Sequence, residues 1–248
     1  MGRRISIVAT ACCLALAIVA SSRAAEKLVL YTSVREPLLG AVCEAFAKAY
    51  PDVELNVLSA GAGRLTEKIR EQRGNGKIVA DVLWSTGIPA FFQFQGEGVL
   101  KPYSAPSHGG RIDPFAGEGR GFTAVFFEAL GVLYNPRLVK KPPRTWEDVL
   151  DKEYTGVFGI ADPMVSGTAF IGISLLVKQY GWDFLQKMLA NKAKIGKSAS
   201  LVAQDVAEGE LVAGMAVDYM ALGKIKRDGT IACVFPRNYL VTPSAVGI

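Results

Sequence analysis

A unit of strand, turn and helix repeats along this chain, and the repeat restricts the fold more than any other feature. In the first half, apolar strands are predicted over residues 27–31, 53–58 and 79–84, and helices follow over 37–50, 65–73 and 89–95. Strands connected in this way lie parallel, with the helices packed on the faces of the sheet. The predicted fold class is therefore α/β.

The alternation continues in the second half, after a loop over residues 101–121 that is rich in Pro, Gly and Ser. Thr145 and Asp148 nearly match a capping box and predict a helix, and Ser166 opens another. The other predicted strands cover 129–134, 157–160, 212–217, 230–235 and 241–248, and the other helices 182–189 and 200–207. With 248 residues, 50% of them hydrophobic, the chain can bury two cores.

The first residues have the pattern of an export signal. Two arginines precede an uncharged apolar run over residues 5–20, and Ser22-Arg23-Ala24 fits a small-x-small cleavage site. A signal peptide over 1–24 is expected, with a membrane anchor as the alternative. No later segment is long and apolar enough to span a bilayer, because Lys178 interrupts the best candidate. The mature protein is expected to be soluble and periplasmic.

Charge and the scarcity of His and Cys exclude several classes of function. The 28 Lys and Arg residues include three arginines of the predicted signal, which leaves 25 against 23 acidic residues, so no nucleic-acid partner is indicated. The single histidine, His108, is expected to be an exposed bystander, and it excludes His-rich metal cages. Cys43 and Cys233 remain after export, and two buried thiols are favoured over a disulfide.

Two strand-to-helix turns have the composition of an anion site: Ser59-Ala60-Gly61-Ala62-Gly63 and Ser166-Gly167-Thr168. Glycine lets an anion approach the unpaired N–H groups at the start of a helix, and hydroxyl groups add donors. The alternative is that each turn only caps a helix and bends the chain. A dinucleotide site is disfavoured, because Thr66 replaces the third glycine of that fingerprint.

Hydroxyl groups also follow two predicted strands, at the edge where open α/β sheets bind ligands. They belong to Tyr31-Thr32-Ser33 and Ser85-Thr86, while Arg35, Asp218 and Tyr219 add a cation, a carboxylate and a phenol. Ordinary turn residues are the alternative, and Asp218 can instead cap the next helix. The sequence has no Walker, Cys-x-x-Cys, Gly-x-Ser-x-Gly or His-Glu-x-x-His motif, so no enzyme and no cofactor are predicted.

Several short motifs occur in a specific order over residues 27–248: LVLYTS at 28–33, ADVLWS at 80–85, GVLKPY at 98–103, TWEDVL at 145–150, ADP at 161–163, SGTA at 166–169 and VDYMA at 217–221. In this order and spacing the chain resembles the periplasmic solute-binding proteins of ABC importers. The resemblance is to their class II group, which handles ferric iron, phosphonates and related small ligands.

The resemblance implies a two-lobed type II periplasmic-binding-protein fold, in which crossing strands join two α/β lobes and one ligand is closed between them. Lobe one would hold residues 25–128 and 238–248, and lobe two residues 129–237. The family continues for several further helices, so lobe one is expected to be incomplete and the fold truncated at its C-terminus. The implied partners are a small-molecule ligand and an ABC permease, and the protein is expected to be a monomer.

The resemblance also bears on the ligand. Ferric members bind metal through two adjacent tyrosines, whereas this chain has Asp218-Tyr219, which leaves Tyr219 as the metal ligand if iron is bound. A small phosphonate or phosphate ester is therefore preferred over ferric iron, with Asp218 available to meet an amine. An exported enzyme is the alternative from another class. The expected ligand-binding residues are Tyr31, Thr32, Ser33, Ser59, Gly61, Ser85, Ser166, Gly167, Thr168, Asp218 and Tyr219.

Overall fold

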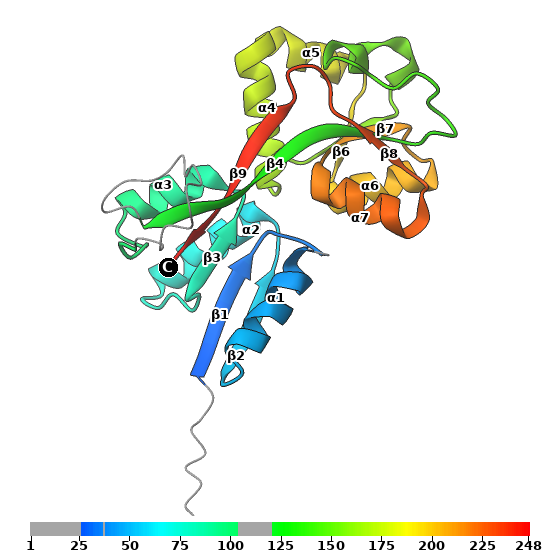
Figure 1. Cartoon of the computed structure of the whole chain (residues 1–248). Helices are drawn as coiled ribbons and strands as arrows, with labels where there is room; N and C mark the ends of the chain where they lie inside the picture. The colour runs from blue at the N-terminus through cyan, green and yellow to red at the C-terminus, as the bar shows by residue number, and fades with distance from the viewer. Residues whose placement is uncertain (1–25, 37, 104–120) are drawn as a thin grey trace, which may run out of the picture.

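The computed structural model describes residues 26–36, 38–103 and 121–248. The predicted signal peptide and His108 lie outside these residues. The described strands form one sheet in the order β2-β1-β3-β9-β4-β7-β5-β6, with β8 paired to β4. In Figure 1 this sheet connects two groups of helices, one around β1 to β3 and one around β5 to β8. We call the strands and helices from β1 to α3 the first lobe, and those from β5 to β8 the second lobe.

The first lobe consists of alternating strands and helices, as the sequence predicts. Strand β1 pairs in parallel with both β2 and β3. Helix α2 buries Leu65 and Ile69, one turn apart, against the sheet. The elements are β1 (Glu26–Thr32), α1 (Leu38–Ala49), β2 (Val53–Ser59), α2 (Ala62–Gly74), β3 (Val82–Ser85) and α3 (Ile88–Gly96).

Two long antiparallel strands, β4 (Phe122–Tyr134) and β9 (Leu240–Gly247), cross from one lobe to the other (Figure 1). Strand β9 is paired on both edges, because it also pairs with β3 through Ala245 and its neighbours. The strand predicted over 129–134 therefore begins earlier, at Phe122, since its first half pairs with β9. The expected lobe boundary between residues 128 and 129 falls inside β4 and stays a proposal.

The second lobe continues the α/β pattern and includes β6, which the sequence did not predict, and α7, which begins at Asp218, where a helix cap was the alternative reading. The expected helix at Thr145 is instead two short 3-10 turns, Glu147–Leu150 and Lys152–Tyr154, because Asp151 between them is extended. The other elements are β5 (Phe158–Ala161), α4 (Gly167–Tyr180), α5 (Trp182–Ala190), β6 (Lys194–Gly196), α6 (Ala199–Glu208), β7 (Ala213–Val217), α7 (Asp218–Asp228) and β8 (Ala232–Val234).

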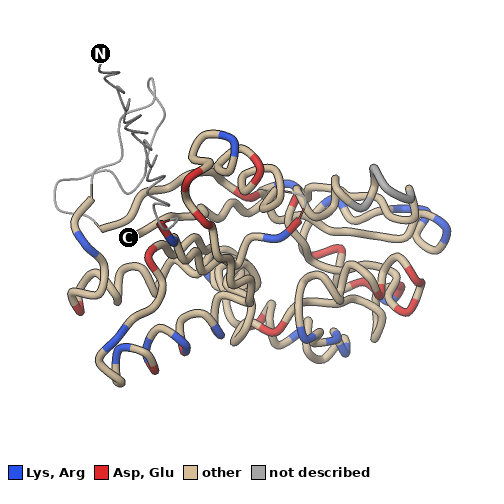
Figure 2. The backbone as a smooth tube through the Cα atoms, turned by 90° about the horizontal axis from the view of Figure 1, so that it is seen from below, with Lys and Arg blue, Asp and Glu red and all other residues tan. Residues whose placement is uncertain are grey.

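Each lobe has its own hydrophobic core. Phe91 and Phe94 lie at the centre of the first-lobe core, and Trp146, Tyr154 and Phe158 at the centre of a second-lobe core. Basic and acidic residues are interspersed along both lobes (Figure 2). Among the helices of the described residues, none combines the length and apolar composition needed to cross a membrane.

The two cysteines of the described chain are free. Cys43 lies on α1 of the first lobe and Cys233 on β8 of the second. Both side chains are partly exposed, so the expectation of free thiols is confirmed, while the expectation that both are buried is wrong.

Candidate functional site

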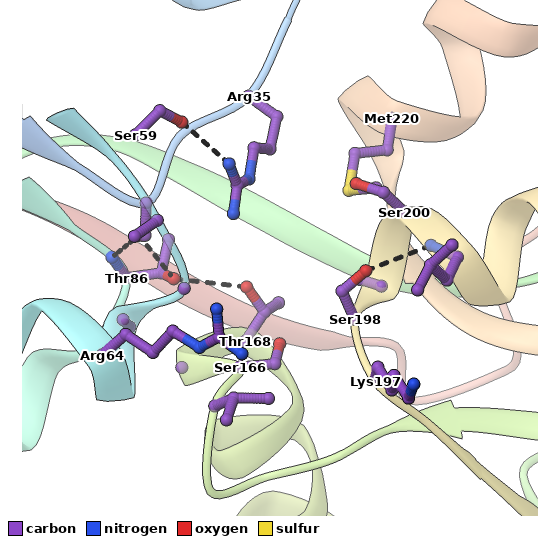
Figure 3. Close-up of a pocket in the computed structure, with 18 of the residues that line it drawn as sticks. Arg35, Ser59, Arg64, Thr86, Ser166, Thr168, Lys197, Ser198, Ser200 and Met220 are labelled. Atoms are coloured by element: carbon purple, nitrogen blue, oxygen red, sulfur yellow. Dashed lines mark hydrogen bonds between the residues drawn. The ribbon is translucent and has the colours of Figure 1, made fainter. Parts of the chain in front are cut away.

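A cavity of about 400 Å³ lies where the two lobes meet. The first lobe supplies the segments that follow β1, β2 and β3, and the second lobe supplies the starts of α4, α6 and α7. Figure 3 shows side chains from both lobes pointing toward one another across this space. The predicted residues that line the cavity are Ser33, Ser59, Gly61, Ser166, Gly167, Thr168 and Tyr219.

Four helices begin at the cavity wall, and α7 is the one with an acidic residue, Asp218, in its first turn. The other three are α2, α4 and α6. Helix α2 follows Gly61 and has no side-chain cap, whereas Ser166 accepts a hydrogen bond from the N–H of Ala169 at 3.2 Å and Ser198 from that of Leu201 at 3.2 Å. None of the three has an acidic residue in its first turn, where Asp and Glu are otherwise favoured. The positive ends of these helices are therefore free to attract an anion.

Three cations also line the cavity: Arg35, Arg64 and Lys197. Arg35 donates a hydrogen bond to Ser59 at 2.8 Å, and Arg64 extends beside Ser166 and Thr168 in Figure 3. Arg64 lies in the first turn of α2, and Lys197 immediately precedes the capping residue of α6. A cation at the positive end of a helix is unfavourable by itself, and a bound anion removes this repulsion.

From sequence, Arg35 was expected only as a nearby cation, and Arg64 and Lys197 were not among the expected ligand-binding residues. Only their position in the sequence could have indicated them. Each lies beside the start of a predicted helix, where a basic residue is unfavourable because it opposes the helix dipole. Ser198 and Ser200, at the start of α6, were not expected at the site either. That start follows β6, which is only three residues long and was not predicted.

Hydroxyl groups connect the two lobes beneath the cavity. The Ser33 hydroxyl lies 3.1 Å from that of Ser85 and accepts a hydrogen bond from the N–H of Thr86 at 3.1 Å. The Thr86 hydroxyl in turn lies 3.2 Å from the hydroxyl of Thr168, at the start of α4. This chain of hydrogen bonds fixes the orientation of Thr168 relative to the first lobe.

Four predicted residues do not line the cavity. Tyr31 is 3% exposed, and its hydroxyl accepts a hydrogen bond from Gln72 at 2.9 Å. Thr32 is buried and accepts one from the N–H of Val34 at 3.1 Å. Both lie within β1, so only Ser33, beyond the end of the strand, reaches the edge. Ser85 is buried one layer below the wall, where it contacts Ser33.

Asp218 is the fourth of these residues. Its carboxylate accepts hydrogen bonds from the N–H of Ala129 at 3.3 Å and of Tyr219 at 2.7 Å. The carboxylate therefore stabilises the start of α7 and joins it to β4. The expectation that Asp218 meets an amine on the ligand finds no support in this geometry.

Glu128 is a buried carboxyl group next to the site, on the crossing strand β4. It is 1% exposed, its Oε2 accepts a hydrogen bond from Thr168 at 3.4 Å, and its Oε1 has no partner among the described residues. Burial, and secondarily the charge of Asp218, raise the pKa of Glu128 to about 8. Burial and the charge of Glu128 also raise the pKa of Tyr219 well above its usual range.

The lobes touch through backbone atoms at three glycines. The N–H of Gly63 donates a hydrogen bond to the carbonyl oxygen of Val165 at 3.4 Å. A Cβ atom at Gly63 would lie 2.1 Å from the carbonyl oxygen of Met164, and one at Gly61 would lie 2.4 Å from that of Val165. A Cβ at Gly167 would lie 2.9 Å from the backbone nitrogen of Gly87. Glycine therefore permits this close approach of the lobes.

Within residues 26–36, 38–103 and 121–248, His, Cys, Asp and Glu form no group of three that could hold a metal ion. The cavity is a space between two α/β lobes, lined by cations, hydroxyl groups and helix starts. This architecture matches solved structures of type II periplasmic binding proteins. The fold is therefore that of a type II periplasmic binding protein.

The chain belongs to the bacterial extracellular solute-binding proteins, because the model of that family matches residues 31–246. A protein of Haemophilus influenzae without an assigned role is 28% identical over 214 residues, which are 81% of this chain and 61% of that protein. A protein of Salmonella typhimurium, provisionally named a 2-aminoethylphosphonate-binding periplasmic protein, is 23% identical, over 83% of this chain and 60% of its own length. The chain thus spans about three fifths of these relatives.

Solved structures with the same fold include the substrate-binding protein of an ABC transporter from Agrobacterium tumefaciens. It has a TM-score of 0.82 and 24% identity, over 92% of this chain and 70% of that one. AfuA from Actinobacillus pleuropneumoniae, with fructose-6-phosphate bound, has a TM-score of 0.79 and 26% identity, over 90% of this chain and 73% of AfuA. Iron-bound HitA from Pseudomonas aeruginosa has a TM-score of 0.74 and 22% identity, over 90% of this chain and 75% of HitA. The family and these neighbours are binding proteins and not enzymes.

Proposed function

We propose that this protein captures a small phosphonate or phosphate ester between its lobes and delivers it to an ABC permease in the inner membrane. The observation that carries the proposal is the wall of the cavity, which contains Arg35, Arg64 and Lys197 and the starts of four helices, three of which, α2, α4 and α6, have no acidic residue in their first turn. A phosphoryl group offers several acceptor oxygens and two negative charges to such a wall. The names of the Salmonella relative and of AfuA support the same ligand class.

The phosphoryl group is placed at the start of α4. The Ser166 hydroxyl oxygen accepts the hydrogen bond from Ala169, and this bond does not use its O–H, which can donate to the ligand. Arg64 extends toward the same point from the other lobe (Figure 3). A ligand held from both sides favours the closed arrangement of the lobes, because it contacts both only when they are together.

Ferric iron with a synergistic anion is the second candidate, because the Tyr219 phenol lines the cavity and iron-bound HitA has the same fold. Iron requires the phenolate, and the raised pKa of Tyr219 opposes its formation. The three cations also repel a metal ion. The geometry therefore favours the anion. A coloured complex with ferric citrate that Tyr219→Phe abolishes, together with no binding of any phosphonate, would reverse this choice.

Isothermal calorimetry with phosphonates, phosphate esters and ferric citrate tests the proposed ligand class. Arg64→Gln should weaken the best phosphorus ligand about 10- to 150-fold, the range for one lost hydrogen bond to a charged group. Lys68→Gln, on the same helix but outside the cavity lining, is the matched control. Equal affinities of the two variants would argue against the proposed site. N-terminal sequencing of the exported protein tests the periplasmic location, with Ala25 expected as the first residue.

A further inference from the structure

The cavity wall has different groups at its two ends. Arg64 lies beside Ser166 and Thr168, where the phosphoryl group is placed, whereas Lys197 lies with Ser198 and Ser200 at the start of α6 (Figure 3). The rest of the ligand therefore faces Lys197 and hydroxyl groups. A volume of about 400 Å³ leaves room for such a part, since a water molecule occupies about 30 Å³.

Two carboxyl groups in contact with residues of the lining, Asp218 and Glu128, have other roles. Asp218 accepts hydrogen bonds from the N–H groups of Ala129 and Tyr219. Glu128 is buried and accepts a hydrogen bond from the hydroxyl of Thr168. Because its pKa is raised to about 8, most molecules carry an uncharged Glu128 at neutral pH. Among the residues that the structure describes, the cavity lining contains Arg35, Arg64 and Lys197 and no Asp or Glu. The net charge of the wall is positive.

We propose that the cavity selects phosphonates and phosphate esters whose other end bears hydroxyl groups, and discriminates against those whose other end bears an ammonium group. This inference rests on the proposed function and narrows its ligand class. An ammonium group would lose its hydration and then lie close to the positive charge of Lys197, which is unfavourable. A hydroxyl group would replace its hydrogen bonds to water by hydrogen bonds to Ser198 and Ser200. The ligand of this chain would then differ from the one named for its Salmonella relative.

Two isosteric pairs of ligands test the proposal by calorimetry at pH 7. They are 2-hydroxyethylphosphonate against 2-aminoethylphosphonate, and ethylene glycol phosphate against ethanolamine phosphate. In each pair the phosphoryl group is constant, and only hydroxyl or ammonium differs. The hydroxyl compound should bind at least about tenfold more tightly, the order expected for repulsion between charges a few Å apart in a partly hydrated cavity.

A charge reversal tests which residue causes the discrimination. Lys197→Glu should shift the affinity ratio in each pair toward the ammonium compound by about tenfold or more, and the ratio is informative even if both affinities fall. Lys194→Glu is the matched control, because Lys194 is exposed on β6 and outside the cavity lining. An unchanged ratio in Lys197→Glu would overturn the role of Lys197.

The outcomes separate this inference from the function on which it rests. Binding of an ammonium compound as tight as that of its hydroxyl partner would overturn the inference and leave anion capture standing. Absence of binding by both pairs, with binding of ferric citrate, would overturn both. Preference for the hydroxyl compounds, lost on Lys197→Glu and kept on Lys194→Glu, would support both.

Discussion

The backbone N–H of Gly63 donates a hydrogen bond to the carbonyl oxygen of Val165, so the first turn of α2 in the first lobe touches the turn that precedes α4 in the second. Both turns also line the cavity. Under the proposed function, contact between the lobes and contact with the ligand would use the same two segments, so that binding would favour closure.

Gly63→Ala should weaken binding of a phosphate ester without destabilising the protein. The added Cβ would lie 2.1 Å from the carbonyl oxygen of Met164, so the lobes cannot approach fully, while alanine suits a helix better than glycine. Gly74→Ala in the same helix meets nothing within 4 Å and is the control. Calorimetry and urea unfolding measure the two effects. Unchanged affinity in Gly63→Ala would contradict a role for this contact in closure.

Gly167→Val should also weaken binding, and the structure gives the reason. A Cβ at residue 167 would lie 2.9 Å from both the Cβ of Ala62 and the backbone nitrogen of Gly87, which belong to the first lobe. The substitution therefore blocks closure as well as the approach of an anion to α4. Gly96→Ala, where a Cβ meets nothing within 4 Å, should bind normally. If Gly167→Val kept the affinity of the best phosphate ester, the anion site at α4 would be wrong.

Ser166→Ala should reduce the affinity for a phosphonate about 10- to 150-fold, because one hydrogen bond to a charged group is lost. The same change removes the cap of α4, at a cost of about 1 kcal/mol of stability. Ser166→Gly separates the two effects, since glycine costs a capping position only a few tenths of a kcal/mol. Ser174→Ala, farther along α4, is the control. Normal affinity in Ser166→Gly would show that the hydroxyl does not contact the ligand.

The stability of the protein should fall as pH rises between about 4.5 and 8. The folded state holds a proton on Glu128 up to a pKa of about 8, whereas the unfolded chain releases it near 4.5, so deprotonation favours unfolding within this window. Urea unfolding at a series of pH values measures the slope. Glu128→Gln should flatten it, and Glu210→Gln, at an exposed position, should not. Equal slopes in the wild type and Glu128→Gln would contradict a buried neutral acid.

Both thiols should react slowly with alkylating reagents at pH 8 while the protein is folded. Burial raises the pKa of Cys233 to about 11 and also raises that of Cys43, so little thiolate is present. Alkylation of the Cys43→Ser variant measures the reaction rate of Cys233 alone, which should be the slower of the two thiols. Alkylation in urea gives the rate of the same thiol in the unfolded chain. A mass lower by two hydrogen atoms under non-reducing conditions would instead reveal a disulfide and contradict free thiols.

The sequence predicted the fold well because its elements have clear signals. Apolar periodicity and glycine turns mark β1 to α3 and α4 to α6, and the motif order led to the correct family. Strand β6 has only three residues, and α7 is polar along much of its length, so neither has a clear apolar pattern. The 3-10 turns at Thr145 were mistaken for a helix because the capping pair is present, with Asp148 accepting from the N–H of Thr145.

The site was predicted in part. The Ser166-Gly167-Thr168 turn was found because glycine and hydroxyl groups at a helix start are an unusual local pattern. Tyr31 and Thr32 were predicted to bind the ligand but do not line the cavity, because the last residue of β1 cannot be located to one position from sequence. Arg64 and Lys197 were missed because a cation on a helix surface is common, and only the packing of the lobes brings these two together.

The most direct measurement is a crystal structure of the full chain with 2-hydroxyethylphosphonate. We predict that its phosphorus atom lies between the lobes, with phosphoryl oxygens within hydrogen-bond distance of the Ser166 hydroxyl and the N–H groups at the start of α4, and with Arg64 in contact from the other lobe. The hydroxyl end should face Lys197 and Ser200. A phosphonate bound away from this cavity, or a metal ion bound by Tyr219 in its place, would contradict anion capture at this site.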